Sequence, residues 1–362
     1  MTKDLLDVRD LCISFKMYGD TARVIRNVNL SIGKGETMAI VGETGCGKSL
    51  TMKTVLGLIS DAQVSGKVLF KDEDLLSKST SYQHSLRGNE IGMIMQDPMS
   101  SLNPTFTIGA QMRDLIHYQG ERKIGIARYL KDQIIIRDKT WRERAINVLE
   151  DVQIAAPERI LNSYPHQLSG GMRQRILIAM SLLSDPDLLI ADEPGTALDV
   201  TTQSKILDIL QSIVEEQDRS VIYITHNLGV AKDISDRVVV MYAGQVVENA
   251  QTEELFKTPL HPYTRGLLES VPSLSRGIGN GMEGSIPDYA TVTDACRFAE
   301  RCPHAEQECR DIVPTNKIID GDRTVNCHLY PESDKQTLED TGEKPYIGPP
   351  PWNAEITERG GR

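Results

Sequence analysis

Short runs of branched apolar residues recur through the first two thirds of the chain and predict the strands of a sheet. The runs occupy residues 7–15, 28–32, 37–41, 67–70, 91–95, 188–191, 221–225 and 238–242. Helical patterns lie between several of them, at residues 48–58, 171–183 and 202–216. Because strands alternate with helices, the pattern predicts an α/β fold with a largely parallel sheet. The short links between the early strands predict an additional antiparallel patch, and residues 245–249 are expected to form the return strand of a hairpin.

The pattern changes along the chain, and each change predicts a boundary. Residues 97–165 are mainly helical, and we interpret the charged stretch at 121–144 as a solvated helix face, so a helical subdomain is predicted at about 97–180. Around 255–275 the alternation of strands and helices ends, and glycine and proline become frequent, which indicates a linker. The predicted units are therefore a first domain at 1–258, a compact cysteine-containing domain at 259–330 and an extended or disordered tail at 331–362.

The composition narrows the class of protein. The chain has 362 residues, of which 40% are hydrophobic and 25% are charged, as in globular proteins. Its net charge of −11 argues against a nucleic-acid binder that relies on a basic surface, although individual loops can still bind phosphate. No apolar run approaches the ~18 residues that a membrane span needs, and the charged N-terminus is unlike a signal peptide. We therefore expect neither a spanning helix nor secretion.

A glycine-rich segment follows the apolar run at 37–41 and opens the helical pattern at 48–58. Its sequence fits G-x-x-x-x-G-K-[ST], and a strand before it and a helix after it are the context that this phosphate-binding motif requires. The glycines let backbone N–H groups turn toward phosphate oxygens, and the start of the helix adds partial positive charge. Lys48 is expected to reach the β- and γ-phosphates, and the Ser49 hydroxyl is expected to ligate Mg²⁺. The predicted nucleotide-binding residues are Gly42, Glu43, Thr44, Gly45, Cys46, Gly47, Lys48, Ser49 and Leu50.

Two acidic residues follow directly on the apolar run at 188–191. Ligands of open α/β sheets bind beyond the carboxyl ends of the strands, so both carboxylates are candidates for the same site. Asp192 is expected to hold Mg²⁺. Glu193 is expected to polarise the water that attacks the γ-phosphate.

The octet at 168–175, LSGGMRQR, resembles the signature motif of the ATP-binding cassette (ABC) ATPases, which are phosphate-loop NTPases. The resemblance covers residues 5–330. It implies that Gln96 is the Q-loop glutamine and a Mg²⁺ ligand, and that Asp199 belongs to the D-loop. It also implies that His226 is the switch histidine, which contacts the γ-phosphate during catalysis.

The same resemblance implies that ATP lies between two subunits. The signature residues of one subunit would face the phosphate loop of its partner, with ATP sandwiched between them; these residues are Ser169, Gly170 and Gly171. An aromatic residue before the phosphate loop usually stacks on adenine in this family. Tyr18 is favoured for that role, and Phe15 is the alternative. Gly195 departs from the family, which usually has threonine there.

Four of the six cysteines fall late in the chain, at Cys296, Cys302, Cys309 and Cys327. Disulfides are not expected in a cytosolic chain, and the spacing alone leaves a zinc site and an iron–sulfur cluster open. The segment at 295–309 resembles the C-terminal extension of the oligopeptide/dipeptide permease ATPases. That resemblance implies a [4Fe–4S] cluster on the four cysteines. Under the zinc alternative, His304 and His328 are further candidate ligands.

The resemblance as a whole implies a D-type ATPase subunit of a bacterial importer of oligopeptides or dipeptides, with ATP and Mg²⁺ as cofactors. The implied partners are a second, F-type ATPase in a heterodimer, two transmembrane permease subunits and, indirectly, an extracellular peptide-binding protein. No nucleic acid is implied as a partner. The implied location is the cytoplasmic face of the cell membrane, as a peripheral protein. An importer of nickel or another solute, and an ABC ATPase without a transport role, are the alternatives.

Overall fold

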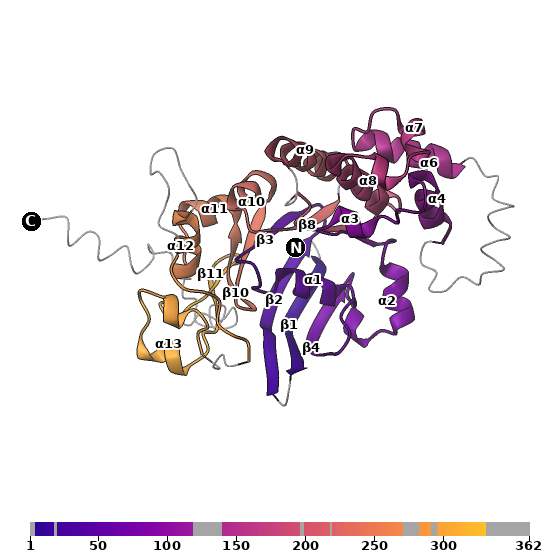
Figure 1. Cartoon of the computed structure of the whole chain (residues 1–362). Coiled ribbons are helices and arrows are strands. Elements are labelled where there is room, and N and C mark those ends of the chain that lie inside the picture. Colours follow the sequence, from indigo (N-terminus) through magenta and orange to yellow (C-terminus); the bar gives the residue numbers. More distant parts are fainter. Residues whose placement is uncertain are drawn as a thin grey trace, which may run out of the picture.

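The structure is a computed structural model that describes residues 4–17, 20–118, 140–195, 199–217, 219–270, 282–290 and 295–330. Figure 1 shows three parts side by side: a helical part, a central part built on two sheets, and the C-terminal elements on the opposite flank. The predicted tail at 331–362 and most of the charged stretch at 121–144 lie outside the described residues. The predicted division into domains stays a prediction.

The central sheet has eight strands in the order β11-β12-β10-β9-β3-β8-β7-β6. Five neighbouring strands run parallel: β9 (Arg237–Tyr242), β3 (Thr37–Val41), β8 (Ser220–Thr225), β7 (Leu188–Asp192) and β6 (Ile91–Ile94). Every residue of β3, β7 and β8 is buried, because helices or the second sheet cover both faces. Continuous apolar runs predict such strands, and the predicted α/β class is confirmed.

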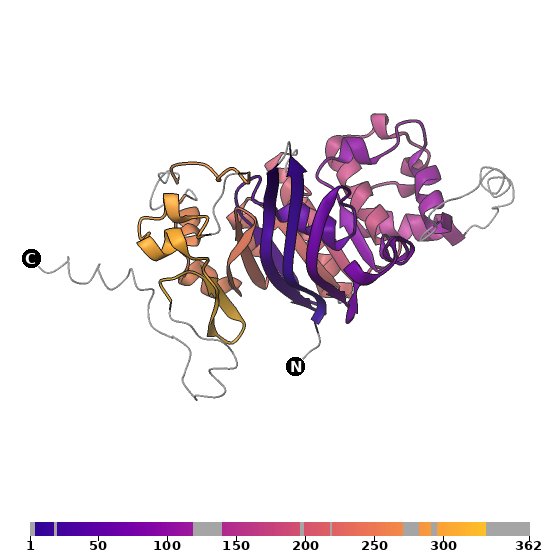
Figure 2. The same cartoon turned by 90° about the horizontal axis from the view of Figure 1, so that it is seen from below.

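A second, antiparallel sheet has the order β2-β1-β4-β5, as the short links between the early strands predict. Its strands are β1 (Asp4–Met17), β2 (Asp20–Gly33), β4 (Ala62–Phe70) and β5 (Glu73–Asp74). Figure 2 shows this sheet between the helical part and the C-terminal elements. Its long strands extend beyond the predicted apolar runs, because one face meets the core and the other alternates polar side chains that the search for apolar runs leaves out. Helix α1 (Lys48–Val55) contributes Met52 and Val55 to the same core.

The helical part has its own apolar core against the other face of the parallel strands. Its helices are α3 (Pro98–Ser101), α4 (Ile108–Tyr118), α6 (Thr140–Asp151), α7 (Pro157–Leu161) and α8 (Gly170–Leu182). The described helices between the sheets and around them are α2 (Thr80–Leu86), α9 (Val200–Gln217) and α10 (Leu228–Ile234). The helices predicted at 48–58, 171–183 and 202–216 all form, with ends that shift by one to three residues.

The C-terminal strands extend the central sheet instead of forming a sheet of their own. The hairpin partner β10 (Gln245–Gln251) pairs with β9 on one edge and with β12 (Arg323–Asn326) on the other, and β11 (Asn316–Asp320) completes the sheet. The sequence pattern does not predict β11 and β12, because they are short and bury only two residues and one residue, respectively. The helices here are α11 (Thr252–Lys257), α12 (Pro262–Glu269) and α13 (Gln307–Asp311). Among the described residues no helix is both long and apolar enough to cross a membrane.

A buried carboxylate fixes the start of α12 on this sheet. Glu248 of β10 is fully buried, and its two oxygens accept the backbone N–H groups of Leu260 and His261 at 2.9 Å each. Arg323 of β12 lies 3.3 Å from the same carboxylate. The charge is therefore compensated by hydrogen bonds and by a cation, as a buried carboxylate requires.

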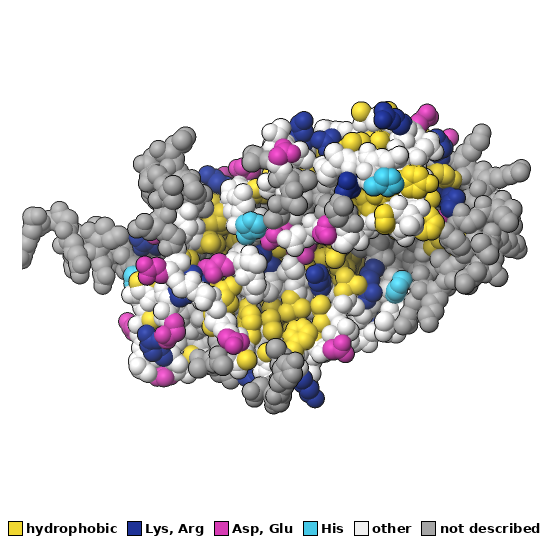
Figure 3. Space-filling view, viewed as in Figure 1, with side chains coloured by type: hydrophobic (Ala, Val, Ile, Leu, Met, Phe, Trp, Pro, Cys, Tyr) yellow, Lys and Arg dark blue, Asp and Glu magenta, His cyan; other side chains and the backbone are white. Residues whose placement is uncertain are grey.

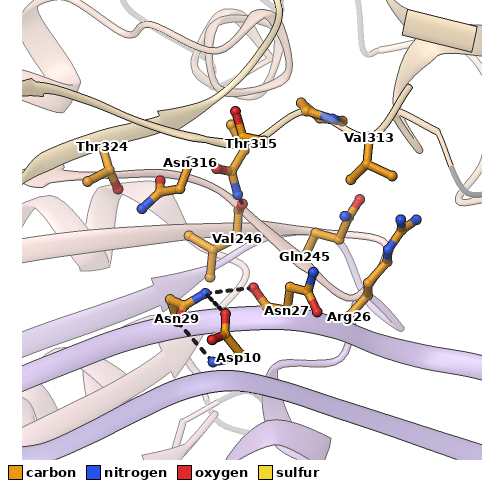
Figure 4. Close-up of a pocket in the computed structure, with 12 residues that line it drawn as sticks. Asp10, Arg26, Asn27, Asn29, Gln245, Val246, Val313, Thr315, Asn316 and Thr324 are labelled. Atoms are coloured by element: carbon orange, nitrogen blue, oxygen red, sulfur yellow. Dashed lines mark hydrogen bonds between the residues drawn. The ribbon is translucent and has the colours of Figure 1, made fainter. Parts of the chain in front are cut away.

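The C-terminal elements and the antiparallel sheet form a pocket of about 370 Å³ between β2, β10 and β12 (Figure 4). On its floor Asn29 donates to the Asp10 carboxylate at 3.1 Å and to the Asn27 carbonyl at 3.1 Å. Asn316 and Thr324 line the opposite side. The floor is thus set by hydrogen bonds within the antiparallel sheet, and the opposite side by the C-terminal strands.

The histidine that caps α12 gives the fold a specific dependence on pH. His261 is 2% exposed, its Nδ1 accepts the Tyr263 N–H at 3.0 Å, and burial lowers its pKa to about 3. The unfolded chain therefore binds a proton that the folded chain does not, and stability falls as the pH drops below the ordinary histidine pKa. Between pH 7 and pH 5 we expect wild type to lose about 2 kcal/mol more unfolding free energy than His261→Asn, which keeps a capping acceptor. Urea unfolding at both pH values measures the difference, and equal losses would contradict it.

Candidate nucleotide-binding site

Four segments with predicted chemistry follow the carboxyl ends of four neighbouring strands. The phosphate loop follows β3, His226 follows β8, the Asp192–Glu193 pair ends β7, and Gln96 follows β6. These strands are adjacent in the order β3-β8-β7-β6, so all four segments lie on one edge of the sheet. The parallel topology alone brings together residues that lie up to 184 positions apart, from Gly42 to His226.

Three glycines give the phosphate loop its shape. Gly42, Gly45 and Gly47 have φ values of 152°, 85° and 102°, which side chains rarely tolerate. A Cβ at Gly42 would lie 2.1 Å from the Met241 carbonyl oxygen, and one at Gly47 would lie 2.4 Å from Ile25. Helix α1 begins at Lys48 without a side-chain cap at Gly47, so its first N–H groups face the loop. This is the arrangement that binds phosphate at a helix start.

Lys48 lies inside the loop. Only 5% of it is exposed, and its ammonium group donates to the carbonyl oxygens of Gly42 at 2.7 Å and Glu43 at 3.1 Å. The loop therefore holds a buried positive charge at its centre. That charge is placed where the motif puts the β- and γ-phosphates.

Two of the three residues predicted to hold Mg²⁺, Ser49 and Asp192, contact each other directly, whereas the third, Gln96, contacts Glu193. The Ser49 hydroxyl donates to the Asp192 carboxylate at 2.7 Å. Asp192 is 3% exposed, and burial raises its pKa while the bond from Ser49 opposes that rise. A hydroxyl and a carboxylate oxygen side by side form the hard oxygen pair that Mg²⁺ prefers. The donor set therefore fits Mg²⁺.

Glu193 lies between two other predicted catalytic side chains, those of Gln96 and His226. One carboxylate oxygen accepts the Gln96 amide N–H at 3.0 Å, and the other lies 3.2 Å from Nδ1 of His226. Glu193 has φ 46°, a left-handed conformation that costs energy in a residue other than glycine, and its N–H donates to the Ile224 carbonyl at 3.1 Å. The strand end thus turns sharply and directs this carboxylate between the Q-loop and the switch histidine.

The signature residues start a second helix. Ser169 is exposed and caps α8 by accepting the Met172 N–H at 3.3 Å. A Cβ at Gly171 would lie 2.6 Å from Thr202, so the signature loop packs on the first turn of α9. Asp199 accepts the N–H and the hydroxyl of the same Thr202 at 2.9 and 2.8 Å, and these bonds lower the pKa of Asp199. The signature residue Gly171 and the D-loop residue Asp199 therefore both contact Thr202.

Three sequence predictions in this region have different outcomes. Tyr18 lies outside the described residues. Its alternative, Phe15, sits within β1 and packs partly buried against the core. At Gly195 a Cβ would lie 2.9 Å from Gln203, so a side chain there has to displace the Gln203 side chain on α9.

The sequence did not predict that residues of the C-terminal elements contact the phosphate loop. Tyr263 of α12 accepts the Glu43 N–H at 3.0 Å, and the Tyr289 hydroxyl donates to the Gly45 carbonyl at 2.8 Å. Arg301 binds the Glu43 carboxylate with both terminal nitrogens at 3.0 Å. Tyr263 belongs to the segment HPYT at 261–264, and no feature of the sequence pointed from that segment to the loop.

The four late cysteines gather in one region but do not form a ligand set. All four are free thiols, and the Cys296 N–H donates to the Cys309 carbonyl at 3.0 Å. Burial, together with the neighbouring thiols, raises the pKa of Cys296 to about 11 and that of Cys327 to about 12. In the part of the chain that the structure describes, no group of three or more His, Cys, Asp or Glu side chains is arranged to hold a metal ion. The implied cluster on Cys296, Cys302, Cys309 and Cys327 is therefore not supported by this arrangement.

The chain resembles known proteins in both of its regions. Residues 25–196 match the family described as ABC transporter, and residues 247–309 match the oligopeptide/dipeptide transporter, C-terminal region. It is 42% identical over 333 residues to the oligopeptide transport ATP-binding protein AppD of Bacillus subtilis (strain 168), which covers 91% of this chain and 97% of AppD. It is 44% identical over 333 residues to the dipeptide transport ATP-binding protein DppD of the same organism, covering 90% of this chain and 94% of DppD.

Solved structures agree with the fold. The dimeric post-hydrolysis state of the ATP-binding cassette MJ0796 bound to ADP and Pi is 26% identical, with a TM-score of 0.58, and the match covers 68% of this chain and 98% of that one. The cbiO1 subunit from Clostridium perfringens is 26% identical, with a TM-score of 0.55, over 70% of this chain and 92% of that one. With the motifs in place along one sheet edge, and with this similarity over nearly the whole length of the curated relatives, the chain belongs to the ABC transporter ATPases, in the group of oligopeptide and dipeptide transport ATP-binding proteins.

Proposed function

We propose that this ATPase powers the import of oligopeptides or dipeptides through a membrane transporter. The observation that carries the proposal is the pairing, in one chain, of the ABC transporter region with the oligopeptide/dipeptide transporter C-terminal region. AppD and DppD, named for oligopeptide and dipeptide transport, share this arrangement at similar length. Other subunits of such an assembly recognise the cargo. The support for the class of cargo therefore comes from the relatives of this chain and not from its geometry.

The proposed reaction is ATP + H₂O → ADP + phosphate, and each residue of the site has a role that its position supports. Lys48 offsets the charge of the γ-phosphate, and Ser49 and Asp192 hold Mg²⁺, which neutralises phosphate charge when bound. Glu193 accepts the proton of the attacking water. Gln96 and His226, each within hydrogen-bond distance of that carboxylate, orient it.

We further propose that two ATPase subunits enclose the nucleotides. The signature residues Ser169 and Gly170 are exposed at the start of α8, which suits contact with ATP on another subunit. The solved cassette MJ0796 is described as a dimer, which supports the same arrangement here. The proposed partner is a second homologous ATPase, the F-type subunit of a heterodimer.

The helical part is the proposed contact with two transmembrane permease subunits, on the cytoplasmic face of the membrane. Figure 3 shows hydrophobic side chains gathered on this part of the molecule. Among the exposed apolar side chains of the described residues, those of the Q-loop and helical part are Met95 at 39%, Phe106 at 45%, Leu115 at 47% and Tyr164 at 38%. Met95 is next to Gln96, so a partner bound here would touch the segment that reaches Glu193.

A [4Fe–4S] cluster on the four late cysteines is a separate proposal, with Zn²⁺ as the alternative. Its support is chemical: four free thiols lie in one region, two of them buried and two partly buried, and backbone amides interact with Cys296, Cys302 and Cys327. Thiolates and amide N–H groups around them are what such clusters use. Since burial raises the pKa values of Cys296, Cys302 and Cys327, these three thiols need a bound cation to ionise at neutral pH.

Replacing the proposed base should trap the bound nucleotide. We expect Glu193→Gln to slow ATP turnover by ~10²–10³-fold, because the amide cannot accept the proton of water. Phosphate release measures turnover, and gel filtration with ATP detects a stable dimer. The control is Glu90→Gln, an exposed glutamate that pairs with Lys71. Turnover at the wild-type rate in Glu193→Gln would contradict the assignment.

Metal analysis of protein purified without oxygen tests the cluster. We expect about four irons per chain and visible absorbance, both lost in Cys302→Ser. Cys12→Ser, outside the group, should keep them. One zinc per chain without iron would establish the alternative, and the absence of both metals would contradict either site.

Reconstitution tests the cargo. We expect ATP hydrolysis in vesicles that hold this chain, its partner ATPase and both permease subunits to rise when a peptide-loaded binding protein is added. The same binding protein without peptide, or a nickel-loaded one, serves as the control. Stimulation by nickel and not by peptide would overturn the proposed cargo and leave the ATPase assignment intact.

A further inference from the structure

The phosphate loop is held from outside by side chains that lie more than 200 positions further along the chain. Tyr263 accepts the Glu43 N–H at 3.0 Å, and the Tyr289 hydroxyl donates to the Gly45 carbonyl at 2.8 Å. Both contacts use the backbone of the loop, so they fix its path directly. Tyr263 is fully buried, and burial raises the pKa of its hydroxyl far above the ordinary value, so it stays protonated.

The third contact joins opposite charges. The Arg301 guanidinium binds the two Glu43 oxygens at 3.0 Å each, and the exposed fractions of the two side chains are 8% and 27%. Arg301 is itself fixed, because it also donates to the Glu283 carbonyl at 2.9 Å and packs over the Tyr242 ring. A two-point bond between a planar guanidinium and a carboxylate defines both position and direction.

A fourth contact acts through the hairpin turn between β9 and β10. The Gly244 N–H donates to the Cys46 carbonyl of the loop at 2.8 Å. Arg297 donates to the Ala243 carbonyl in that turn, and to the Arg23 carbonyl of β2 at 2.7 Å. Arg297 thus holds the turn against the antiparallel sheet. In that position the turn supports the phosphate loop.

Together these contacts fix three of the first five residues of the loop, namely Glu43, Gly45 and Cys46. Glycine-rich segments lose much conformational entropy when they are ordered, and a loop that binds phosphate has to direct several N–H groups inward at once. A loop that is already ordered avoids this cost when ATP arrives. The supporting side chains of Tyr263, Tyr289, Arg297 and Arg301 all lie within the family region at 247–309, while Gly244 precedes it.

We propose that Arg301, Tyr289 and Tyr263 are positioning residues for the nucleotide, so that the C-terminal elements set the ATP affinity of the phosphate loop in the same chain. The inference rests on the proposed role of residues 42–49 as the ATP phosphate site. It adds a function for the C-terminal region that does not involve cargo, permease subunits or metal.

The test measures the Kd of a fluorescent ATP analogue and the kcat and KM of ATP hydrolysis in the full chain. We expect Arg301→Gln to weaken binding about five- to tenfold and Tyr289→Phe about threefold, with kcat at saturating ATP changed less than twofold. Arg301→Lys should restore part of the loss, because it keeps the charge but not the two-point bond. Arg301→Gln and Glu43→Gln each remove the same ion pair. The double variant should therefore bind ATP no more weakly than whichever single variant has the higher Kd.

Two matched controls keep a general loss of stability apart from a loss of positioning. Tyr330→Phe removes a buried hydroxyl bond to the Leu260 carbonyl at 2.9 Å, and Arg310→Gln breaks an exposed pair with Glu300; neither bond reaches the loop. Both controls should bind ATP as wild type does, whatever their melting temperatures.

Distinct results separate this inference from the proposed site. If Lys48→Ala binds ATP as tightly as wild type, the phosphate site itself is wrong. A lost hydrogen bond is expected to weaken binding ~threefold. If Lys48→Ala loses binding while the Kd values of Arg301→Gln and Tyr289→Phe stay within about 1.5-fold of wild type, only the positioning role is overturned. Additive losses in the double variant would overturn it as well. Tyr289→Phe removes only the hydroxyl of a partly buried ring, so the test does not depend on whether Arg301→Gln folds.

Discussion

The parallel pairing of β3, β8, β7 and β6 is the constraint on which the site depends. Parallel neighbours end on the same side, so each strand delivers its following residues to one edge. The register is continuous across these strands, and all residues of the three central ones are buried. A buried strand cannot slip without moving apolar side chains out of the core, so the relative heights of Lys48, Asp192 and His226 follow from packing.

The features that the sequence predicted depend on local patterns, whereas the contacts that it missed join residues far apart in the chain. The phosphate loop, the Asp192–Glu193 pair and His226 could be placed because each follows its strand directly, and local pattern determines the strand. The predicted companions of Glu193 also meet it, although only the topology of the sheet shows that one carboxylate lies between Gln96 and His226. The contacts of Arg301 and Tyr263 with the loop cross more than 200 positions, and no local pattern encodes them.

The C-terminal strands were missed for a related reason. β11 buries only Lys317 and Ile319, and β12 buries only Val325. β12 pairs with β10, a hairpin strand formed far earlier in the chain, and β11 pairs with β12. Helix α12 lies within 255–275, where the alternation of strands and helices ends, and the buried Glu248 fixes its start. The sequence pattern does not predict this link, because Glu248 and His261 are brought together only by the fold.

Gly244 shows that the phosphate loop depends on residues outside its sequence motif. Its φ is 78°, and a Cβ there would lie 1.7 Å from the Val24 carbonyl, a closer approach than at any glycine of the phosphate loop. Beside the Arg297 side chain, two backbone hydrogen bonds of Gly244 join the loop to the antiparallel sheet: its N–H donates to the Cys46 carbonyl at 2.8 Å, and its carbonyl accepts the Arg26 N–H at 2.9 Å. Exchange of side chains in the flanking strands leaves that bridge intact, while the addition of a single methyl group at position 244 breaks it. The glycine requirement of the nucleotide site thus includes a residue nearly two hundred positions outside the motif that defines it.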